Sequence, residues 1–166
     1  APQDSEEITL LIDIGTNAEI ILGNCHHLMA ASSPTGPAFE GAQISSGQRA
    51  AVGAIERVRI NPNNYEPSYK VIGSDEWSDS ADFLNEVKKT GLTGICGSGI
   101  IEIIAEMYLA GIISEDGVIN GALSSKTKRI EKSGRTFCYK VTEQIAITQA
   151  DVRAIQLAKA ALYLSL

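Results

Sequence analysis

One stretch near the amino end, residues 10–23, constrains the fold more than any other part of the chain. It reads LLIDIGTNAEIILG, an apolar run interrupted by one carboxylate and a Gly-Thr-Asn turn before it becomes apolar again. Such apolar runs are typical of buried strands, and a glycine-containing turn between two of them indicates a hairpin. We therefore predict strands at Ile8–Ile14 and Ala18–Leu22, joined at the turn, and a third strand at Leu28–Ala31.

The predicted turn carries groups that suit a phosphate ligand. Gly15 would let the backbone approach a ligand closely, while Thr16 and Asn17 offer a hydroxyl and an amide donor. Asp13 would hold a hydrated magnesium ion or an attacking water, because hard cations prefer carboxylate oxygens. The alternative is an ordinary tight turn between two core strands, since short glycine-containing patterns often match by chance.

Composition limits the class of protein. The chain has 166 residues, is 44% hydrophobic and carries a formal net charge of −6. This size and apolar content predict a single α/β domain at residues 8–166 behind a polar tail at residues 1–7. The acidic balance argues against a nucleic-acid partner, and no apolar run approaches the roughly 20 residues of a membrane span. We expect a cytoplasmic protein that binds neither nucleic acid nor membrane.

Three cysteines, far apart in the sequence, disfavour both a disulfide framework and an iron–sulfur cluster within this chain. The triplet Cys25-His26-His27 resembles a set of metal ligands. Neighbours on a strand point to opposite faces, however, so at most Cys25 and His27 could converge, and two ligands do not complete a zinc site. We interpret the triplet as an exposed hairpin turn after Asn24, and Cys96 as a small buried residue.

A second glycine-rich element, TGICGSG at residues 93–99, leads directly into an apolar run that ends at Gly111. The spacing predicts a helix whose apolar stripe contains residues 100, 101, 104, 107 and 108. Gly97, Ser98 and Gly99 would then lie at a helix N-terminus, where unpaired N–H groups attract phosphate or carboxylate. A cap without any ligand is the alternative interpretation.

The middle of the chain carries weaker patterns. A loop at residues 32–42 has the composition of functional loops, and Glu40 is its charged residue. The residue pattern predicts two strands, at residues 55–60 and 69–72. Residues 73–89 are polar, and we expect them to form a segment on the surface that contains Trp77 and a short helix at residues 82–89.

The last third of the chain combines a hairpin with a helix. Residues 118–119 predict a short strand, and residues 129–147 a hairpin that turns at Ser133-Gly134. A capping box from Thr148 to Asp151 opens the final helix, whose buried side is predicted to carry residues 152, 155, 158 and 162. The basic side chains of this region are expected in solvent or on a modest docking surface: Lys126, Lys128, Arg129, Lys132 and Arg135.

Four segments occur in a specific order: IDIGTNAEI at 12–20, GPAFEGAQI at 36–44, GICGSG at 94–99 and QADVRAIQLAKAA at 149–161. Together they resemble the reductive activators of corrinoid proteins. Members of that family are ferredoxin-like proteins with a C-terminal ATPase of the acetate and sugar kinase, Hsp70 and actin superfamily. They use ATP to drive the reduction of cobalt in a corrinoid methyltransferase system.

The resemblance implies an α/β fold, one lobe of an actin-like (ribonuclease H-like) ATPase, whose mixed sheet starts with the hairpin and has helices packed against it. It implies ATP and Mg²⁺ as cofactors, with Asp13 as the catalytic residue that also holds Mg²⁺ through water. The residues that it assigns to nucleotide binding are Gly15, Thr16, Asn17, Glu19, Gly36, Glu40, Gly41, Gly97, Ser98 and Gly99.

The resemblance also implies what lies outside this chain. A [2Fe–2S] cluster is expected only on the missing N-terminal part of the parent, and a corrinoid protein is the expected partner, with a homodimer as a further expectation. The chain begins without methionine and ends within or just after a helix, so we expect a fragment of a longer polypeptide. One lobe cannot surround the γ-phosphate, and the fragment alone is therefore expected to be inactive.

Two alternatives stay open at the level of sequence. One is a lobe of a small-molecule kinase of the same superfamily, such as an acetate, sugar or pantothenate kinase. The other is a non-catalytic module that uses the scaffold for oligomerisation or partner binding. Nucleotide titration of the complete protein separates them, because a pure scaffold would show no magnesium-dependent ATP binding.

Overall fold

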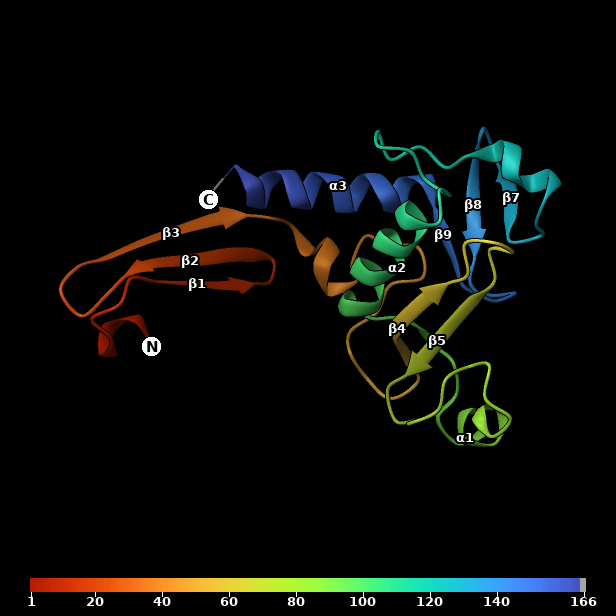
Figure 1. The fold of residues 1–166 in the computed structure, drawn as a ribbon, viewed down its shortest axis with the longest axis horizontal. Coiled ribbons are helices and arrows are strands. Elements are labelled where there is room, and N and C mark those ends of the chain that lie inside the picture. Colours follow the sequence, from red (N-terminus) through yellow and green to blue (C-terminus); the bar gives the residue numbers. More distant parts are fainter. Residues whose placement is uncertain (165–166) are drawn as a thin grey trace.

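The predicted hairpin is part of a three-stranded antiparallel sheet. In this computed structural model, which describes residues 1–164, β1 (Thr9–Ile14), β2 (Asn17–Gly23) and β3 (Leu28–Pro34) pair in chain order. Ile12 lies opposite Ile20, which lies opposite Ala31. Figure 1 shows this sheet extending away from the other two sheets, with α3 (Gln149–Tyr163) along its upper side. The three predicted strands are confirmed.

α3 covers only part of this first sheet. Ala18, Ile20 and Ser33 are buried, and the Ser33 hydroxyl donates to the Ala161 carbonyl at 3.3 Å. Among the described residues, β1 has no strand on its outer edge. Many large apolar side chains of the sheet and its flanks remain exposed: Ile8, Leu10, Leu11, Ile14, Leu28 and Met29. The sheet is thus less completely buried than the remainder of the fold.

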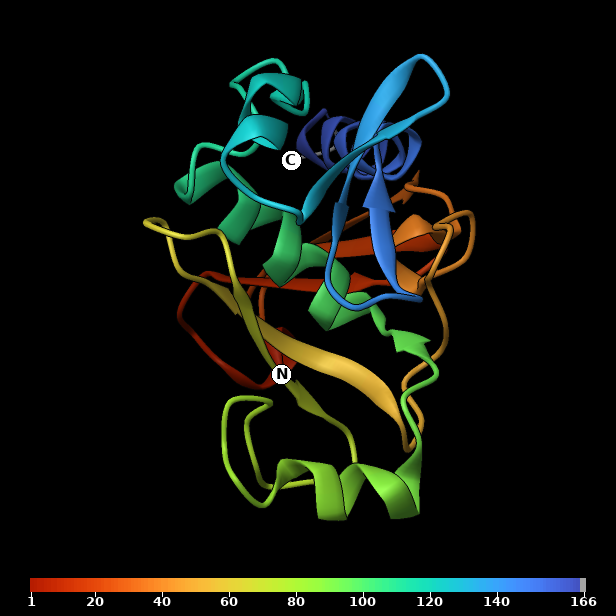
Figure 2. The same cartoon turned by 90° about the vertical axis from the view of Figure 1, so that its right-hand side faces the viewer.

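The second sheet is mixed and supports α2. β4 (Ala54–Ile60) pairs antiparallel with β5 (Pro67–Val71) and parallel with the two-residue β6 (Gly94–Ile95). α2 (Gly97–Leu109) follows β6 and packs on β4. α1 (Phe83–Thr90) lies far from α3, as Figure 2 shows, and its Phe83 packs edge-on against Tyr69 of β5. The predicted surface segment therefore packs onto the domain through Phe83.

The third sheet is an antiparallel meander. β7 (Ile130–Ser133), β8 (Thr136–Lys140) and β9 (Ala146–Thr148) pair in chain order, so the predicted hairpin contains a third strand. β9 runs directly into α3 through the predicted capping box, in which Thr148 Oγ1 accepts from the Asp151 N–H and Asp151 accepts from the Thr148 N–H. Short 3₁₀ helices complete the fold at Pro2–Asp4 (η1), Pro37–Glu40 (η2) and Gly121–Ser125 (η3).

Two local predictions are wrong. The stretch at residues 118–119 forms only an isolated bridge between Ile113 and Ile119. α2 buries residues 100, 103 and 107, whereas Ile101 and Tyr108 of the predicted stripe are about half exposed.

Four of the five basic side chains near the last hairpin are exposed as predicted: Lys126, Lys128, Lys132 and Arg135. Arg129 is partly buried, since its guanidinium forms an ion pair with Glu66 at 2.6 Å and donates to the carbonyl of residue 141.

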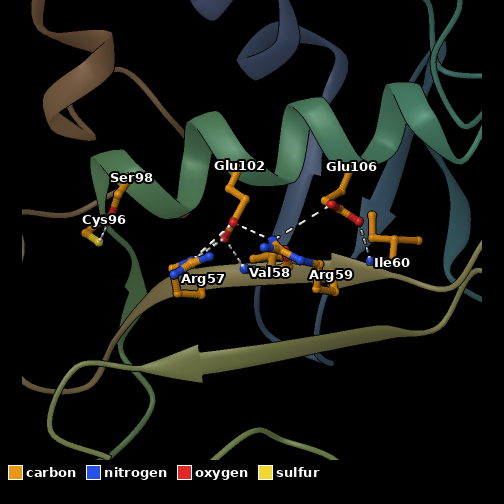
Figure 3. A network of polar contacts seen from close by, with 8 residues as sticks. All are labelled: Arg57, Val58, Arg59, Ile60, Cys96, Ser98, Glu102 and Glu106. Atoms are coloured by element: carbon orange, nitrogen blue, oxygen red, sulfur yellow. Dashed lines mark hydrogen bonds and ion pairs between the residues drawn. The ribbon is translucent and has the colours of Figure 1, made fainter. Parts of the chain in front are cut away.

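Two carboxylates of α2 complete the edge of β4. β6 pairs with only the first two residues of β4, and beyond them Glu102 accepts from the Val58 N–H at 2.6 Å and Glu106 from the Ile60 N–H at 2.9 Å. Figure 3 shows both glutamates reaching from α2 to β4, with Arg57 and Arg59 paired to Glu102. The two carboxylates accept hydrogen bonds from backbone N–H groups that would otherwise donate to the carbonyls of a neighbouring strand.

The same contacts set the acidity of Glu102. Burial alone would raise the pKa of its carboxyl, but the hydrogen bonds from Arg59, Val58 and Arg57 outweigh burial and hold the pKa below its ordinary value. The side chain is about one-fifth exposed, so solvent screens these contacts only in part.

Within residues 1–164, none of the helices combines the length and the apolar character needed to cross a membrane.

Gly99→Ala tests the packing of α2 on β4. An alanine Cβ at this position would clash with the Ile55 carbonyl oxygen and lie 2.8 Å from Ile95 Cγ2. We expect the free energy of unfolding to fall by about 1–3 kcal/mol, although alanine is the better helix former. Denaturant unfolding measures the change, and Ala105→Ser on the exposed side of α2 is the control. A stabilised Gly99→Ala protein would contradict the packing.

Glu102→Gln tests the carboxylate contacts through their pH dependence. Because the folded carboxyl has the lower pKa, its contribution is present at neutral pH and is lost as the pH falls below its ordinary pKa of about 4.3. We expect the variant to lose about 1–3 kcal/mol of unfolding free energy at pH 7, and less at pH 3. Urea unfolding at several pH values measures this, with the exposed Glu115→Gln as control. A difference that stays constant with pH would argue against the contacts.

Candidate functional site

The hairpin turn, η2 and the loop that follows η2 enclose a hollow of about 460 Å³. We call it the Thr16 hollow. It is lined by Thr16, Pro37, Glu40, Gly41, Ala42, Gly47, Gln48 and Arg49.

The turn between β1 and β2 is held against the β3–η2 connection by hydrogen bonds. Thr35 is buried, and its hydroxyl donates to the Gly15 carbonyl at 2.9 Å, while the Gly36 N–H donates to the Thr16 carbonyl at 2.9 Å. The Thr16 hydroxyl donates to Glu40 Oε1 at 2.7 Å. These contacts fix Thr16 at the edge of η2, because both its carbonyl and its hydroxyl have partners there.

Two glycines shape the hollow through backbone contacts. Gly41 has a φ of 85°, in the left-handed region, and a Cβ on it would lie 2.5 Å from the Gln48 carbonyl oxygen. A Cβ on Gly47 would clash with the Gly41 carbonyl oxygen. The end of η2 and the loop at residues 47–48 therefore approach more closely than side chains would allow.

The loop at residues 45–49 is anchored from two other elements. The buried Asp151 of α3 accepts from the Ser45 N–H at 2.8 Å and from the Ser45 hydroxyl at 3.1 Å. Ile95 of β6 donates to the Ser46 carbonyl at 2.8 Å and accepts from the Gln48 N–H at 2.9 Å. The backbone that carries Arg49 is thus held by both α3 and β6.

Several predicted site residues meet at this hollow. Thr16, Glu40 and Gly41 line it together. Gly15 borders it, because a Cβ at Gly15 would lie 3.3 Å from Glu40 Oε1. Gly36, with a φ of 74°, holds the turn from behind through its N–H.

Other predicted site residues lie outside the lining of the hollow. Asp13 and Glu19 are exposed and face each other in the register of β1 and β2, and the Ser32 hydroxyl donates to Glu19 at 3.3 Å. Asn17 is exposed at the start of β2, opposite Pro34.

The glycines at the start of α2 position the helix. A Cβ on Gly97 would clash with the Phe39 carbonyl oxygen of η2, and Gly99 is buried against β4. Ser98 is exposed, and its hydroxyl lies 3.2 Å from the thiol of Cys96, which is buried as predicted. The N-terminus of α2 therefore lies directly against η2, outside the lining of the hollow.

Sequence reasoning missed Gly47, Gln48 and Arg49. They follow η2 in an irregular loop and belong to no periodic pattern, so a glycine two residues before a cation was the one local signal in this stretch. Glu40 and Arg49 bring opposite charges to the hollow, yet no ion pair between them is among those of residues 1–164.

The triplet Cys25-His26-His27 forms the predicted exposed turn. The Asn24 side-chain oxygen accepts from the N–H groups of His26 at 3.0 Å and His27 at 3.1 Å. In the part of the chain that the structure describes, no group of three or more His, Cys, Asp or Glu side chains is placed to hold a metal ion.

Two known proteins resemble this chain, one of them over almost its whole length. It is 37% identical over 175 residues to the corrinoid activation enzyme RamQ of Eubacterium limosum, which covers 98% of this chain and 26% of RamQ. It is 33% identical over 116 residues to the [Co(II) methylated amine-specific corrinoid protein] reductase of Methanosarcina barkeri, which covers 66% of this chain and 21% of that protein. The chain thus spans about a quarter or less of the length of these relatives.

A solved structure and a family model agree with these relatives. The structure of a reductive activator for corrinoid, iron–sulfur protein matches with a TM-score of 0.82 and 35% identity, covering 98% of this chain and 24% of that chain. Residues 7–166 match the family described as the C-terminal domain of RACo, the ASKHA domain. The predicted actin-like fold class is confirmed. The chain therefore belongs to the family of RACo C-terminal ASKHA domains, the family predicted from its four sequence segments.

Proposed function

We propose that this chain is the phosphate-binding part of an ATP-dependent reductive activator of a corrinoid protein. The observation that carries the proposal is the Thr16 hollow, which joins the hairpin turn to η2. The names of the relatives support the corrinoid partner, since RamQ is a corrinoid activation enzyme and the Methanosarcina protein is a corrinoid protein reductase.

The donor set of the hollow fits a nucleotide phosphate with Mg²⁺. The Arg49 guanidinium and the close backbone groups suit phosphate oxygens, and Glu40, which the Thr16 hydroxyl holds in place, suits a hydrated cation. A magnesium ion keeps most of its waters and needs only one or two carboxylates besides phosphate, which agrees with the absence of a three-ligand cluster in residues 1–164. The bound nucleotide would supply the free energy of phosphoryl transfer to the full-length protein.

Asp13 is proposed to orient the attacking water or a magnesium-bound water. Side chains alternate along a strand, so Asp13 shares a face with the position of a Cβ at Gly15, which is near Glu40 Oε1. This supports an arrangement with the two carboxylates, Asp13 and Glu40, toward the same side of the turn. Because Asp13 is exposed, its replacement should leave the fold intact.

Electron transfer is assigned to the rest of the parent protein. The cysteines of this chain occupy separate places: Cys25 is exposed in a turn, Cys96 is buried and Cys138 lies in β8. Since a [2Fe–2S] cluster needs four organised ligands, we place it outside this chain.

Thr16→Val in the full-length protein tests the hollow as a nucleotide site. The change keeps the side-chain volume and removes the hydrogen bond from the Thr16 hydroxyl to Glu40. Because Glu40 is then no longer held at the hollow, we expect MgATP affinity to fall about tenfold. Isothermal titration calorimetry measures the dissociation constant, with Thr136→Val of β8 as the control. If the wild-type protein shows no magnesium-dependent ATP binding, a scaffold role replaces this proposal; if Thr16→Val binds normally, the nucleotide lies elsewhere.

Asp13→Asn in the full-length protein separates catalysis from binding. We expect ATP turnover to fall at least about 100-fold, because the amide cannot accept a proton from water, with MgATP affinity changed little. Steady-state phosphate release measures turnover, and circular dichroism checks the fold. Asp75→Asn, at an exposed position outside the first sheet, is the control. Unchanged turnover in Asp13→Asn would refute the catalytic assignment.

A further inference from the structure

Arg49 is the only cationic residue that lines the Thr16 hollow. Within residues 1–164, its guanidinium has no hydrogen-bond or ion-pair partner, whereas those of Arg57, Arg59 and Arg129 are all paired. A guanidinium carries five donors in a planar fork that matches the oxygens of phosphate. Arg135 and Arg153 likewise have no protein partner among these residues, but neither lines the hollow. Arg49 is thus the unpaired arginine that is available to a ligand of the hollow.

The backbone that presents Arg49 is rigidly held. Gly47 forms a bridge with Ile95 of β6, the Gln48 N–H donates to Ile95, and the Gln48 side chain donates to Thr93 at 2.9 Å. Asp151 holds Ser45 a few residues earlier. The side chain therefore extends from a fixed base, which limits the entropy lost when it binds a ligand.

Thr16 of the hairpin turn lines the same hollow. Its N–H has no hydrogen-bond acceptor among the residues that the structure describes, although its carbonyl and hydroxyl both have partners. Arg49 and Thr16 thus come to one hollow from two segments, and each carries a donor without a protein acceptor. Donors of this kind are available to an anionic oxygen.

The negative charge of Glu40 favours an anion whose own charge is partly neutralised. Its carboxylate lines the same hollow and would repel a bare polyphosphate. A polyphosphate whose charge is partly neutralised by Mg²⁺ meets less repulsion. A magnesium-complexed phosphate chain is therefore the ligand class that suits a hollow with one cation and one anion.

We propose that Arg49 binds the phosphate chain of the nucleotide and makes the affinity of this site depend on the number of phosphates. This inference rests on the proposed function, because it assigns a specificity residue to the same site. Arg49 contacts the phosphate oxygens directly in the hollow that it lines with Thr16.

Titration of the full-length protein with MgATP, MgADP and AMP tests the role of Arg49. We expect Arg49→Gln to weaken MgATP binding about tenfold or more and AMP binding less than about twofold. Arg49→Lys should weaken MgATP binding by an intermediate factor, because lysine keeps the positive charge but lacks the planar set of donors of a guanidinium. Arg135→Gln, an exposed arginine at the β7–β8 turn, is the matched control. Circular dichroism verifies that the variants fold.

The outcomes distinguish this inference from the proposed function. If the wild-type protein binds MgATP and Arg49→Gln binds it equally well, Arg49 is not a phosphate ligand and the proposed function stands. An equal loss for MgATP and AMP would also overturn the inference, because it indicates a general disturbance of the hollow. If the wild-type protein binds none of the three ligands, the proposed function fails, and this inference with it.

Discussion

Contacts between backbone atoms at a few glycines determine where each part of the candidate site lies. Gly97 lets the start of α2 rest on the Phe39 carbonyl of η2, and Gly41 and Gly47 let the end of η2 meet the following loop. Gly99 sets α2 on β4 in the same way. Since a Cβ at any of these positions meets backbone atoms, which cannot move aside as a flexible side chain can, the shape of the Thr16 hollow depends on all of them.

The hollow gathers segments that are distant in the sequence. Thr16 comes from the first hairpin and Arg49 from a loop that is held by Ile95 and by Asp151. The loop is held by backbone hydrogen bonds to Ile95 and by the part-buried hydrogen bonds from Ser45 to Asp151. This arrangement explains how an irregular loop can present a side chain from a defined position.

The sequence predicted those helices and strands whose formation depends mainly on neighbouring residues. The alternating apolar runs identified β1 to β3, and the Thr148–Asp151 capping box identified the start of α3. The buried stripe of α2 was mispredicted because Gly99 and the two glutamates choose which side faces β4, and this choice depends on the strand. Ile100, Ile101, Ile103 and Ile104 are all apolar, so hydropathy alone does not decide which of them face β4.

Long-range contacts explain the rest of the missed features. Arg129 pairs with Glu66, which is 63 residues away in the sequence, so no local pattern could remove it from solvent. Arg49 was overlooked for a related reason, because the bridge from Gly47 to Ile95 brings it to the hollow. For Asp13, Glu19 and Asn17, the structure gives positions on the first sheet, and their roles stay predictions.

Polar groups that hold the fold together have hydrogen-bond partners within the protein, whereas some polar groups at the candidate site do not. In residues 1–164, no buried side-chain nitrogen or oxygen lacks a hydrogen-bond partner, and both Asp151 and Glu102 accept several hydrogen bonds. Groups that hold the fold are satisfied because an unpaired buried polar atom would destabilise it. Arg49 differs, since its guanidinium has no protein partner although the residue lines a concave surface. Because Arg49 is exposed, water satisfies its donors, and a ligand can replace that water without breaking a contact that holds the fold.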